Sequence, residues 1–163
     1  HGGAQARADL LGDAVQGVPN DNDWPTAEYP DLAVDDNVET KYLHRKGGSM
    51  ATGLQIAPLA GPAVVTGLTF TTANDAGGRD PIAYRLSGSN EAAQGPYTLI
   101  AEGDIVDFSQ DTEWPRFTKN ETPITFENTT AYAHYELIIT AIRDVGADMT
   151  QIAEVELLGE LAP

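Results

Sequence analysis

Short runs of alternating apolar and polar residues constrain the fold of this chain more than any other feature. Within residues 64–72, for example, Leu68, Phe70 and Thr72 fall on one face of an extended strand. Similar runs occur at 54–57, 82–87, 97–101, 124–127, 133–142 and 152–159. Clusters of Gly, Pro, Asn and Asp separate the runs, and no long helical period follows residue 20. The pattern predicts an all-β fold, a single antiparallel β-sandwich.

The length of 163 residues fits one domain with a sizeable core. We expect residues 1–18 to be an N-terminal extension or tag remnant with a short helical turn over 8–15. Residues 19–163 then form the sandwich domain. The segment 104–122 has no clear strand pattern and predicts a long loop. Long loops on a rigid sandwich often carry binding sites.

The charge balance narrows the range of partners. The chain has 25 acidic and nine basic residues, for a net charge of −16. This charge disfavours nucleic acid and anionic membranes as partners, because both need a basic surface. The absence of cysteine excludes disulfides and thiolate metal sites. The composition favours a highly soluble extracellular protein or a calcium-rich setting.

Five short motifs follow one another between residues 30 and 159. They are Ala33-x-Asp35-x-Asn37-x-x-Thr40-Lys41-Tyr42, Arg79-Asp80-Pro81-x-x-Tyr84-x-Leu86-Ser87-Gly88-Ser89-Asn90, Tyr97-Thr98-Leu99-Ile100, His134-Tyr135-x-Leu137-x-Ile139 and Gln151-Ile152-Ala153-Glu154-Val155-Glu156-Leu157. Their content and order resemble the galactose-binding-like, or discoidin-like, domains. These include the family 32 carbohydrate-binding modules, which stand beside catalytic domains in secreted bacterial enzymes. The resemblance implies a jelly-roll sandwich. The chain departs from the pattern at Tyr42, where the family usually has Trp.

A candidate calcium site lies in the first motif. Asp35, Asn37 and Thr40 offer a carboxylate, an amide oxygen and a hydroxyl within six residues, and calcium takes six to eight oxygen ligands. In the similar domains the matching positions hold a structural calcium ion. The resemblance therefore implies that Glu154 and the backbone carbonyl of Leu32 complete the site. The alternative is a solvated turn in which the Asp35 side chain accepts bonds from nearby N–H groups.

Two tryptophans are candidates for stacking on a sugar ring. Trp24 lies in the Asn- and Asp-rich segment 20–25, and Trp114 lies two residues before Arg116 in a Pro-restrained segment. The alternative for each tryptophan is that it closes one end of the sandwich core.

Polar candidates for the same ligand fall in two further segments. Asn74, Asp75 and Arg79 lie between two predicted strands, where an arginine beside amide and carboxylate groups suits hydroxyl recognition. The alternative is an internal salt bridge of Arg79 with Asp75 or Asp80. His44 and Lys46, with Arg45 between them, form a local basic cluster that could contact a sulfate or uronate, or simply balance nearby Asp residues.

No motif in the chain indicates catalysis. A Gly-x-Ser-x-Gly elbow is absent, and the three histidines lack metalloprotease spacing. With 25 acidic residues, carboxylate pairs are inevitable, and nothing marks one as special. We therefore expect a non-catalytic, extracellular carbohydrate-binding module with a structural calcium ion. It would direct an attached enzyme or surface protein to a polysaccharide. The alternative is a protein-binding or adhesion module of a large extracellular bacterial protein.

Overall fold

A computed structural model describes residues 14–58 and 60–162. Its larger sheet has the strand order β1-β3-β8-β5-β6. The strands of this sheet are Ala14–Val18, Thr52–Ala57, His134–Ile142, Pro81–Ser89 and Thr98–Asp104. A second sheet has the order β10-β4-β7, formed by Glu154–Leu161, Ala63–Thr71 and Ile124–Thr125. β2 (Tyr42–His44) and β9 (Thr150–Ile152) make a separate pair, and all these pairings are antiparallel.

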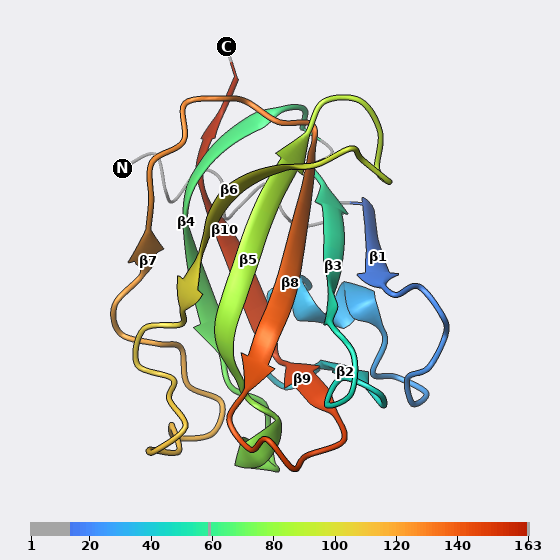
Figure 1. The fold of residues 1–163 in the computed structure, drawn as a ribbon, viewed down its shortest axis with the longest axis vertical. Helices are drawn as coiled ribbons and strands as arrows, with labels where there is room; N and C mark the ends of the chain where they lie inside the picture. The colour runs from blue at the N-terminus through green and yellow to red at the C-terminus, as the bar shows by residue number, and fades with distance from the viewer. Residues whose placement is uncertain (1–13, 59, 163) are drawn as a thin grey trace.

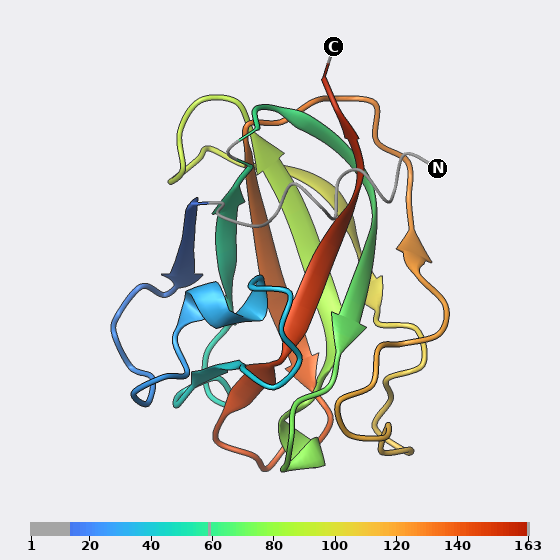
Figure 2. The same cartoon turned by 180° about the vertical axis from the view of Figure 1, so that it is seen from behind.

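The two larger sheets face one another and enclose the core (Figures 1 and 2). In β8 the predicted alternation is confirmed, since Tyr135, Leu137 and Ile139 are all buried. The Tyr135 hydroxyl crosses the core to β4. There it donates to the carbonyl of Ala63 and accepts a bond of 3.2 Å from the backbone N–H of Val65. This contact fixes the spacing of the two sheets. The prediction of an all-β antiparallel sandwich is confirmed.

The predicted final run, residues 152–159, is divided between two sheets. β9 ends at Ile152 and pairs with β2, whereas β10 begins at Glu154 and pairs with β4. Ala153, between them, is fully buried. The chain therefore passes from one end of the sandwich into its second sheet at the residue that precedes Glu154.

The N-terminal segment differs from its prediction. Ala14 and Val15, the last residues of the expected helical turn, belong to β1, while residues 8–13 lie outside the described part of the chain. β1 pairs with β3 along its length, from Ala14 opposite Ala57 to Val18 opposite Gly53. Because their backbone pairs with β3 at the edge of the sheet, Ala14 and Val15 form a strand despite the weak helical pattern of the sequence.

The predicted long loop is present between β6 and β7 and is anchored by Asn120. The Asn120 side chain is 3% exposed and accepts a hydrogen bond of 3.0 Å from Phe70 N. Its amide nitrogen donates to the carbonyls of Val106 and Thr122 at 3.2 and 2.9 Å. These three bonds hold the loop against the end of β4.

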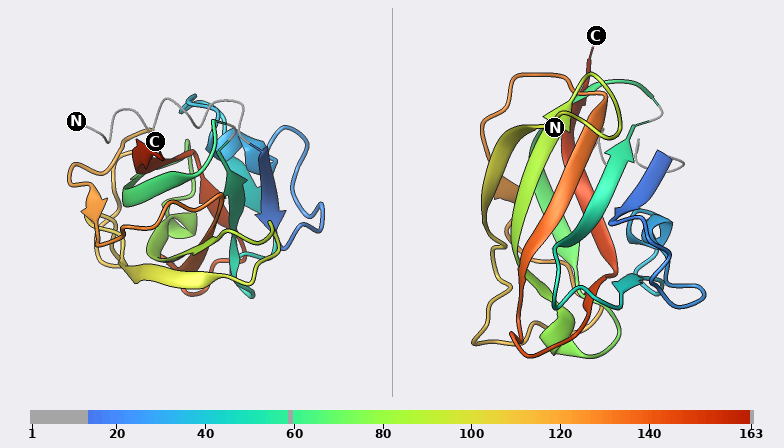
Figure 3. Two further views of the ribbon diagram at one scale, coloured as in Figure 1. Left: turned by 90° about the horizontal axis from the view of Figure 1, so that it is seen from above. Right: turned by 45° about the vertical axis from the view of Figure 1, so that its right-hand side comes forward.

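Several connections gather at one end of the sandwich, the lower end in Figure 1. They are the segment after β1, the turn between β2 and β3, the short 3-10 helix η2 (Gly77–Arg79), the β6–β7 loop and the β8–β9 loop. The views of Figure 3 show the same arrangement. A second 3-10 helix, η1 (Pro30–Ala33), covers the side of the sandwich. Among the described residues, no helix is long and apolar enough to cross a membrane.

Candidate functional site

The turn after η1 gathers oxygen atoms around Asp35. One Asp35 oxygen accepts a bond of 3.0 Å from Asn37 N, and the other accepts a bond of 2.5 Å from Thr40 Oγ1. The Asn37 side-chain oxygen accepts from Glu39 N at 2.9 Å. Asp36 has a positive φ of 60°, which tightens the turn. Leu32 lies in η1, just before this turn. The bond from Asn37 N to Asp35 is the kind of local hydrogen bond expected for the alternative, a solvated turn without an ion.

Glu154 brings a second carboxyl group to the same turn from the start of β10. It is 6% exposed, and its Oε1 has no hydrogen-bond partner among the described residues. Burial, followed by the adjacent Asp35 carboxyl, raises the pKa of Glu154 to about 9, although backbone N–H groups of Asn37 and Asp36 partly oppose the rise. The sequence prediction that these two distant segments meet in space agrees with this geometry.

Two neighbouring carboxyl groups with an unsatisfied buried oxygen need a positive charge or a proton between them. Carboxylate, amide, hydroxyl and backbone oxygens are the ligands that calcium prefers. The residues of this turn therefore fit a hard divalent cation, which would allow Glu154 to ionise.

A second group of polar residues surrounds η2. Lys41 Nζ lies 2.9 Å from both Asp75 Oδ1 and Gln151 Oε1, and 3.4 Å from Glu28 Oε1. The Gln151 amide also donates to the backbone carbonyl of Asp75 at 2.5 Å. The hydrogen bond and charge of Lys41, with help from Arg79 and Arg116, lower the pKa of Asp75. The network holds the loop that carries Asn74 and Asp75.

Arg116 pairs with Asp80 inside this end of the sandwich. Its guanidinium donates to the two carboxylate oxygens of Asp80 at 3.0 and 2.5 Å. It also donates to the backbone carbonyls of Asp75 and Trp114, at 3.2 and 2.8 Å. Arg116 therefore joins the β6–β7 loop to the η2 segment.

Arg79 makes none of the salt bridges that the alternative interpretation considered. Its guanidinium has no hydrogen bond or ion pair with any described residue, although its charge acts on Asp75. Asn74 is exposed, and its side chain has no hydrogen bond with any described residue. An arginine and an amide without protein partners are available to a ligand.

The sequence interpretation missed Phe117, an aromatic residue in the same region. It is 46% exposed, and its backbone N–H donates to the carbonyl of Ala73, the residue before Asn74, at 3.4 Å. Its φ of +56° is unusual for a bulky residue and signals backbone strain. The exposure and φ of a residue cannot be read from a sequence pattern. The segment itself was identified as a candidate, because Trp114 and Arg116 lie in it.

The two tryptophans pack mainly against the protein. Trp24 contacts Tyr42 edge-on, with ring centroids 6.0 Å apart. Trp114 packs on Phe108 at 5.9 Å, and its indole N–H donates to the carbonyl of Lys119 at 3.3 Å. Both rings are half-buried against the core. This placement favours the alternative role, closure of the sandwich end.

His44 is fully buried in β2, which corrects the expectation of a surface basic cluster. Its ring nitrogens lie 2.7 Å from Thr52 Oγ1 and 3.1 Å from Asp21 Oδ1. The strand pairing of β2 with β9 turns the ring inward. Lys46 is exposed and pairs with Asp23 at 3.4 Å. Thus Trp24, His44 and Lys46 belong to a region around the segment after β1, apart from the Asn74–Arg79 and Trp114–Phe117 cluster.

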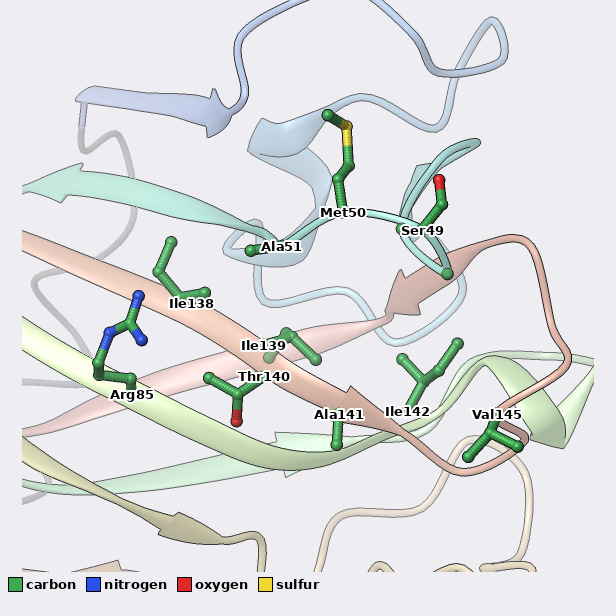
Figure 4. Close-up of a pocket in the computed structure, with 12 residues that line it drawn as sticks. Ser49, Met50, Ala51, Arg85, Ile138, Ile139, Thr140, Ala141, Ile142 and Val145 are labelled. Atoms are coloured by element: carbon green, nitrogen blue, oxygen red, sulfur yellow. The ribbon is translucent and has the colours of Figure 1, made fainter.

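A cavity of about 480 Å³ lies on the outer face of the larger sheet (Figure 4). Its lining comes from the β2–β3 turn, β5, β8 and the β8–β9 loop, and includes Met50, Arg85, Ile138 and Val145. None of the described residues that line the cavity is aromatic. It therefore lacks the stacking ring that sugar sites commonly use.

No protein-family profile and no curated protein matches the sequence. Several solved structures match its fold. CpGH89CBM32-5 from Clostridium perfringens, in complex with GalNAc-β-1,3-galactose, has a TM-score of 0.68 and 14% identity, with 96% of this chain and 98% of that chain covered. The family 32 carbohydrate-binding module of Clostridium perfringens NanJ, in complex with galactose, has a TM-score of 0.64 and 15% identity, with 94% and 96% covered.

The chain has the fold of family 32 carbohydrate-binding modules. A third structure, CBM32-3 from a family 31 glycoside hydrolase of Clostridium perfringens, gives a TM-score of 0.70 at 12% identity and covers 98% of this chain and 99% of that chain. The resemblance inferred from the sequence motifs is confirmed at the level of the fold. At these identities the family 32 fold does not specify a ligand, so the ligand must be inferred from the side chains of this chain.

Proposed function

We propose that this protein is a non-catalytic carbohydrate-binding module whose site lies at the η2 end of the sandwich. The observation that carries the proposal is an exposed aromatic residue, Phe117, whose backbone bonds to the residue before Asn74. The side chains of Asn74 and Arg79, in the same region, have no hydrogen bond or ion pair with any described residue. The similar modules in complex with galactose and GalNAc-β-1,3-galactose support a galactose-type sugar as the ligand.

The chemistry of the three side chains suits a pyranose ring. The face of Phe117 can pack against the apolar C–H face of the sugar, while amide and guanidinium groups bond its hydroxyls. Asp75 is 56% exposed and offers a carboxylate acceptor next to Arg79. The buried Arg116–Asp80 pair keeps the two loops in position without using the ligand-facing groups.

We propose that Asp35, Asn37, Thr40, Glu154 and the Leu32 carbonyl hold a calcium ion. The support is the unpartnered Glu154 oxygen beside a second carboxyl group. A calcium ion supplies positive charge there and stabilises the turn that leads into β2. The proposed role of the ion is structural, since this turn is not part of the proposed sugar site at Phe117, Asn74 and Arg79.

The module is proposed to act outside the cell, attached to an enzyme or surface protein that it directs to a polysaccharide. One similar structure is itself a module of a family 31 glycoside hydrolase, which supports such an attachment. The net charge of −16 fits a soluble extracellular protein and disfavours strongly anionic polysaccharides.

Isothermal titration with galactose and N-acetylgalactosamine, in calcium buffer, tests the site. Phe117→Ala and Arg79→Ala should each weaken binding about tenfold or more, with the melting temperature changed little. Leu99→Ala is the matched control, because it removes a similarly exposed apolar side chain (51%) from β6. Unchanged binding in both site variants would contradict the proposed location. Absence of binding to these sugars and to a broad glycan array would favour the adhesion-module alternative.

A further inference from the structure

A second cluster of metal-ligand side chains lies apart from the Asp35–Glu154 turn. One ring nitrogen of His44 and one carboxylate oxygen each from Asp21 and Asp23 lie within 4.8 Å of one another. It is the one such group of three His, Asp or Glu residues in the described chain. The two aspartates come from the segment after β1, whereas the histidine comes from β2.

The His44 ring is oriented as a metal ligand would be. The side chain is fully buried, and Nδ1 is 2.7 Å from the hydroxyl of Thr52 on the adjacent strand. Nε2 points at the Asp21 carboxylate, 3.1 and 3.2 Å from its two oxygens. Metal-ligating histidines commonly have one nitrogen held by a hydrogen bond while the other faces the ion.

The backbone brings the two aspartates to this nitrogen. Asp23 N donates to Asp21 Oδ1 at 3.1 Å, and Arg45 N donates to the Asp23 carbonyl at 3.0 Å. The Asp23 carboxylate also lies 3.5 Å from Arg45 and 3.4 Å from Lys46. Both cationic side chains are largely exposed, so these ion pairs are weak and can open.

The Tyr42 hydroxyl provides a second, independent observation. Tyr42 is fully buried two residues before His44 on β2, and its hydroxyl has no hydrogen-bond partner among the described residues. Tyr42 and His44 are two residues apart on β2, so their side chains lie on the same face of this strand. A buried hydroxyl without a partner is unfavourable by about 1–3 kcal/mol. A water molecule bound to an ion in the cluster would satisfy it.

We propose that Asp21, Asp23 and His44 form a site for a first-row divalent metal ion, for which Zn²⁺ is the best match. One imidazole and two carboxylates suit zinc, with bond lengths of about 2.0–2.2 Å. Calcium prefers oxygen ligands alone, which distinguishes this site from the Asp35–Glu154 turn. With three protein ligands, the ion keeps one position for water.

The ion would fasten the segment after β1 to β2. That segment carries Trp24, which packs against Tyr42. A metal bond between the two elements would therefore hold the tryptophan in its place at the end of the core. The role is structural and independent of sugar binding.

The test is calorimetric titration of the chelator-treated full chain with Zn²⁺ alone, together with melting curves. One ion should bind per chain and raise the melting temperature. Asp21→Asn and Asp23→Asn should each weaken binding at least tenfold. Both side chains are partly exposed and the changes keep their size, so these variants should fold. Co²⁺ in place of Zn²⁺ should give a visible absorption band that the same variants lose.

Matched controls separate this site from other sources of metal affinity. His1→Ala and His134→Ala remove the other two histidines of the chain and should leave Zn²⁺ binding unchanged. Glu154→Gln should abolish the effect of Ca²⁺ but keep that of Zn²⁺. The proposal is overturned if the unmodified chain binds no Zn²⁺, if both aspartate variants bind as it does, or if His1→Ala removes the binding.

Discussion

Arg116, and not Arg79, neutralises the buried carboxylate of Asp80. The two arginines approach the same segment from different loops, yet only the Arg116 guanidinium forms bonds with Asp80. Arg79 is the last residue of η2, whereas Arg116 belongs to the long β6–β7 loop. One arginine therefore stabilises the end of the sandwich and the other remains available to a ligand.

Replacing these arginines should have opposite consequences. Arg116→Ala leaves Asp80, which is 2% exposed, without its cation, and should lower the free energy of unfolding by about 3–5 kcal/mol. Arg79→Ala should change it by less than about 0.5 kcal/mol. Urea denaturation followed by tryptophan fluorescence measures both variants. Equal stabilities for the two variants would show that the pair with Asp80 is unimportant.

The pH dependence of stability should reveal Glu154. In the cation-free protein its pKa of about 9 lies above the ordinary value of 4.5 that it regains on unfolding. The contribution of Glu154 to the free energy of unfolding is fully present below pH 4.5. It is lost as the pH rises towards 9, by at most about 1.4 kcal/mol per pH unit. Melting curves in chelator should therefore show falling stability over this range.

Calcium should cancel this fall, because the bound ion favours the ionised carboxylate. Glu154→Gln should remove both the fall in chelator and the stabilisation by calcium, since the amide does not titrate. A chelator-treated protein with the same pH profile as its Glu154→Gln variant would count against the proposed site.

The Tyr135 hydroxyl should contribute measurably to the joining of the sheets. Tyr135→Phe leaves the backbone groups of Ala63 and Val65 without this partner in the core, and should reduce stability by about 1–3 kcal/mol. Tyr84→Phe is the matched control, because Tyr84 is a buried tyrosine whose hydroxyl bonds to no described residue. Comparable losses in the two variants would contradict a specific role for the cross-sheet bonds.

The fold could be predicted because its strands carry their burial pattern in the sequence. In β8 the residues expected to face inward, Tyr135, Leu137 and Ile139, are buried, and Ile138 on the opposite face is buried as well. β1 was not predicted, because Ala14–Val18 has little hydrophobic pattern. Its strand conformation depends on backbone pairing with β3. The meeting of Asp35 with Glu154 could be anticipated because motif order places the two segments at the ends of one sandwich.

The candidate site was only partly predictable, because its residues depend on the path of the β6–β7 loop. Asn74 and Arg79 were identified from their residue types. Phe117 was not, since its exposure and positive φ arise from tertiary contacts. The basic context of His44 suggested a surface position, but pairing of β2 with β9 buries its ring.

The most direct test of the account is an NMR titration of the ¹⁵N-labelled protein with galactose in calcium buffer. A ligand bound at the η2 end should give saturable shifts concentrated at the backbone amides of Asn74, Asp75, Arg79 and Phe117. Shifts that cluster instead around Met50 and Val145, at the cavity on the sheet face, would contradict it, as would the absence of any shift with galactose or N-acetylgalactosamine.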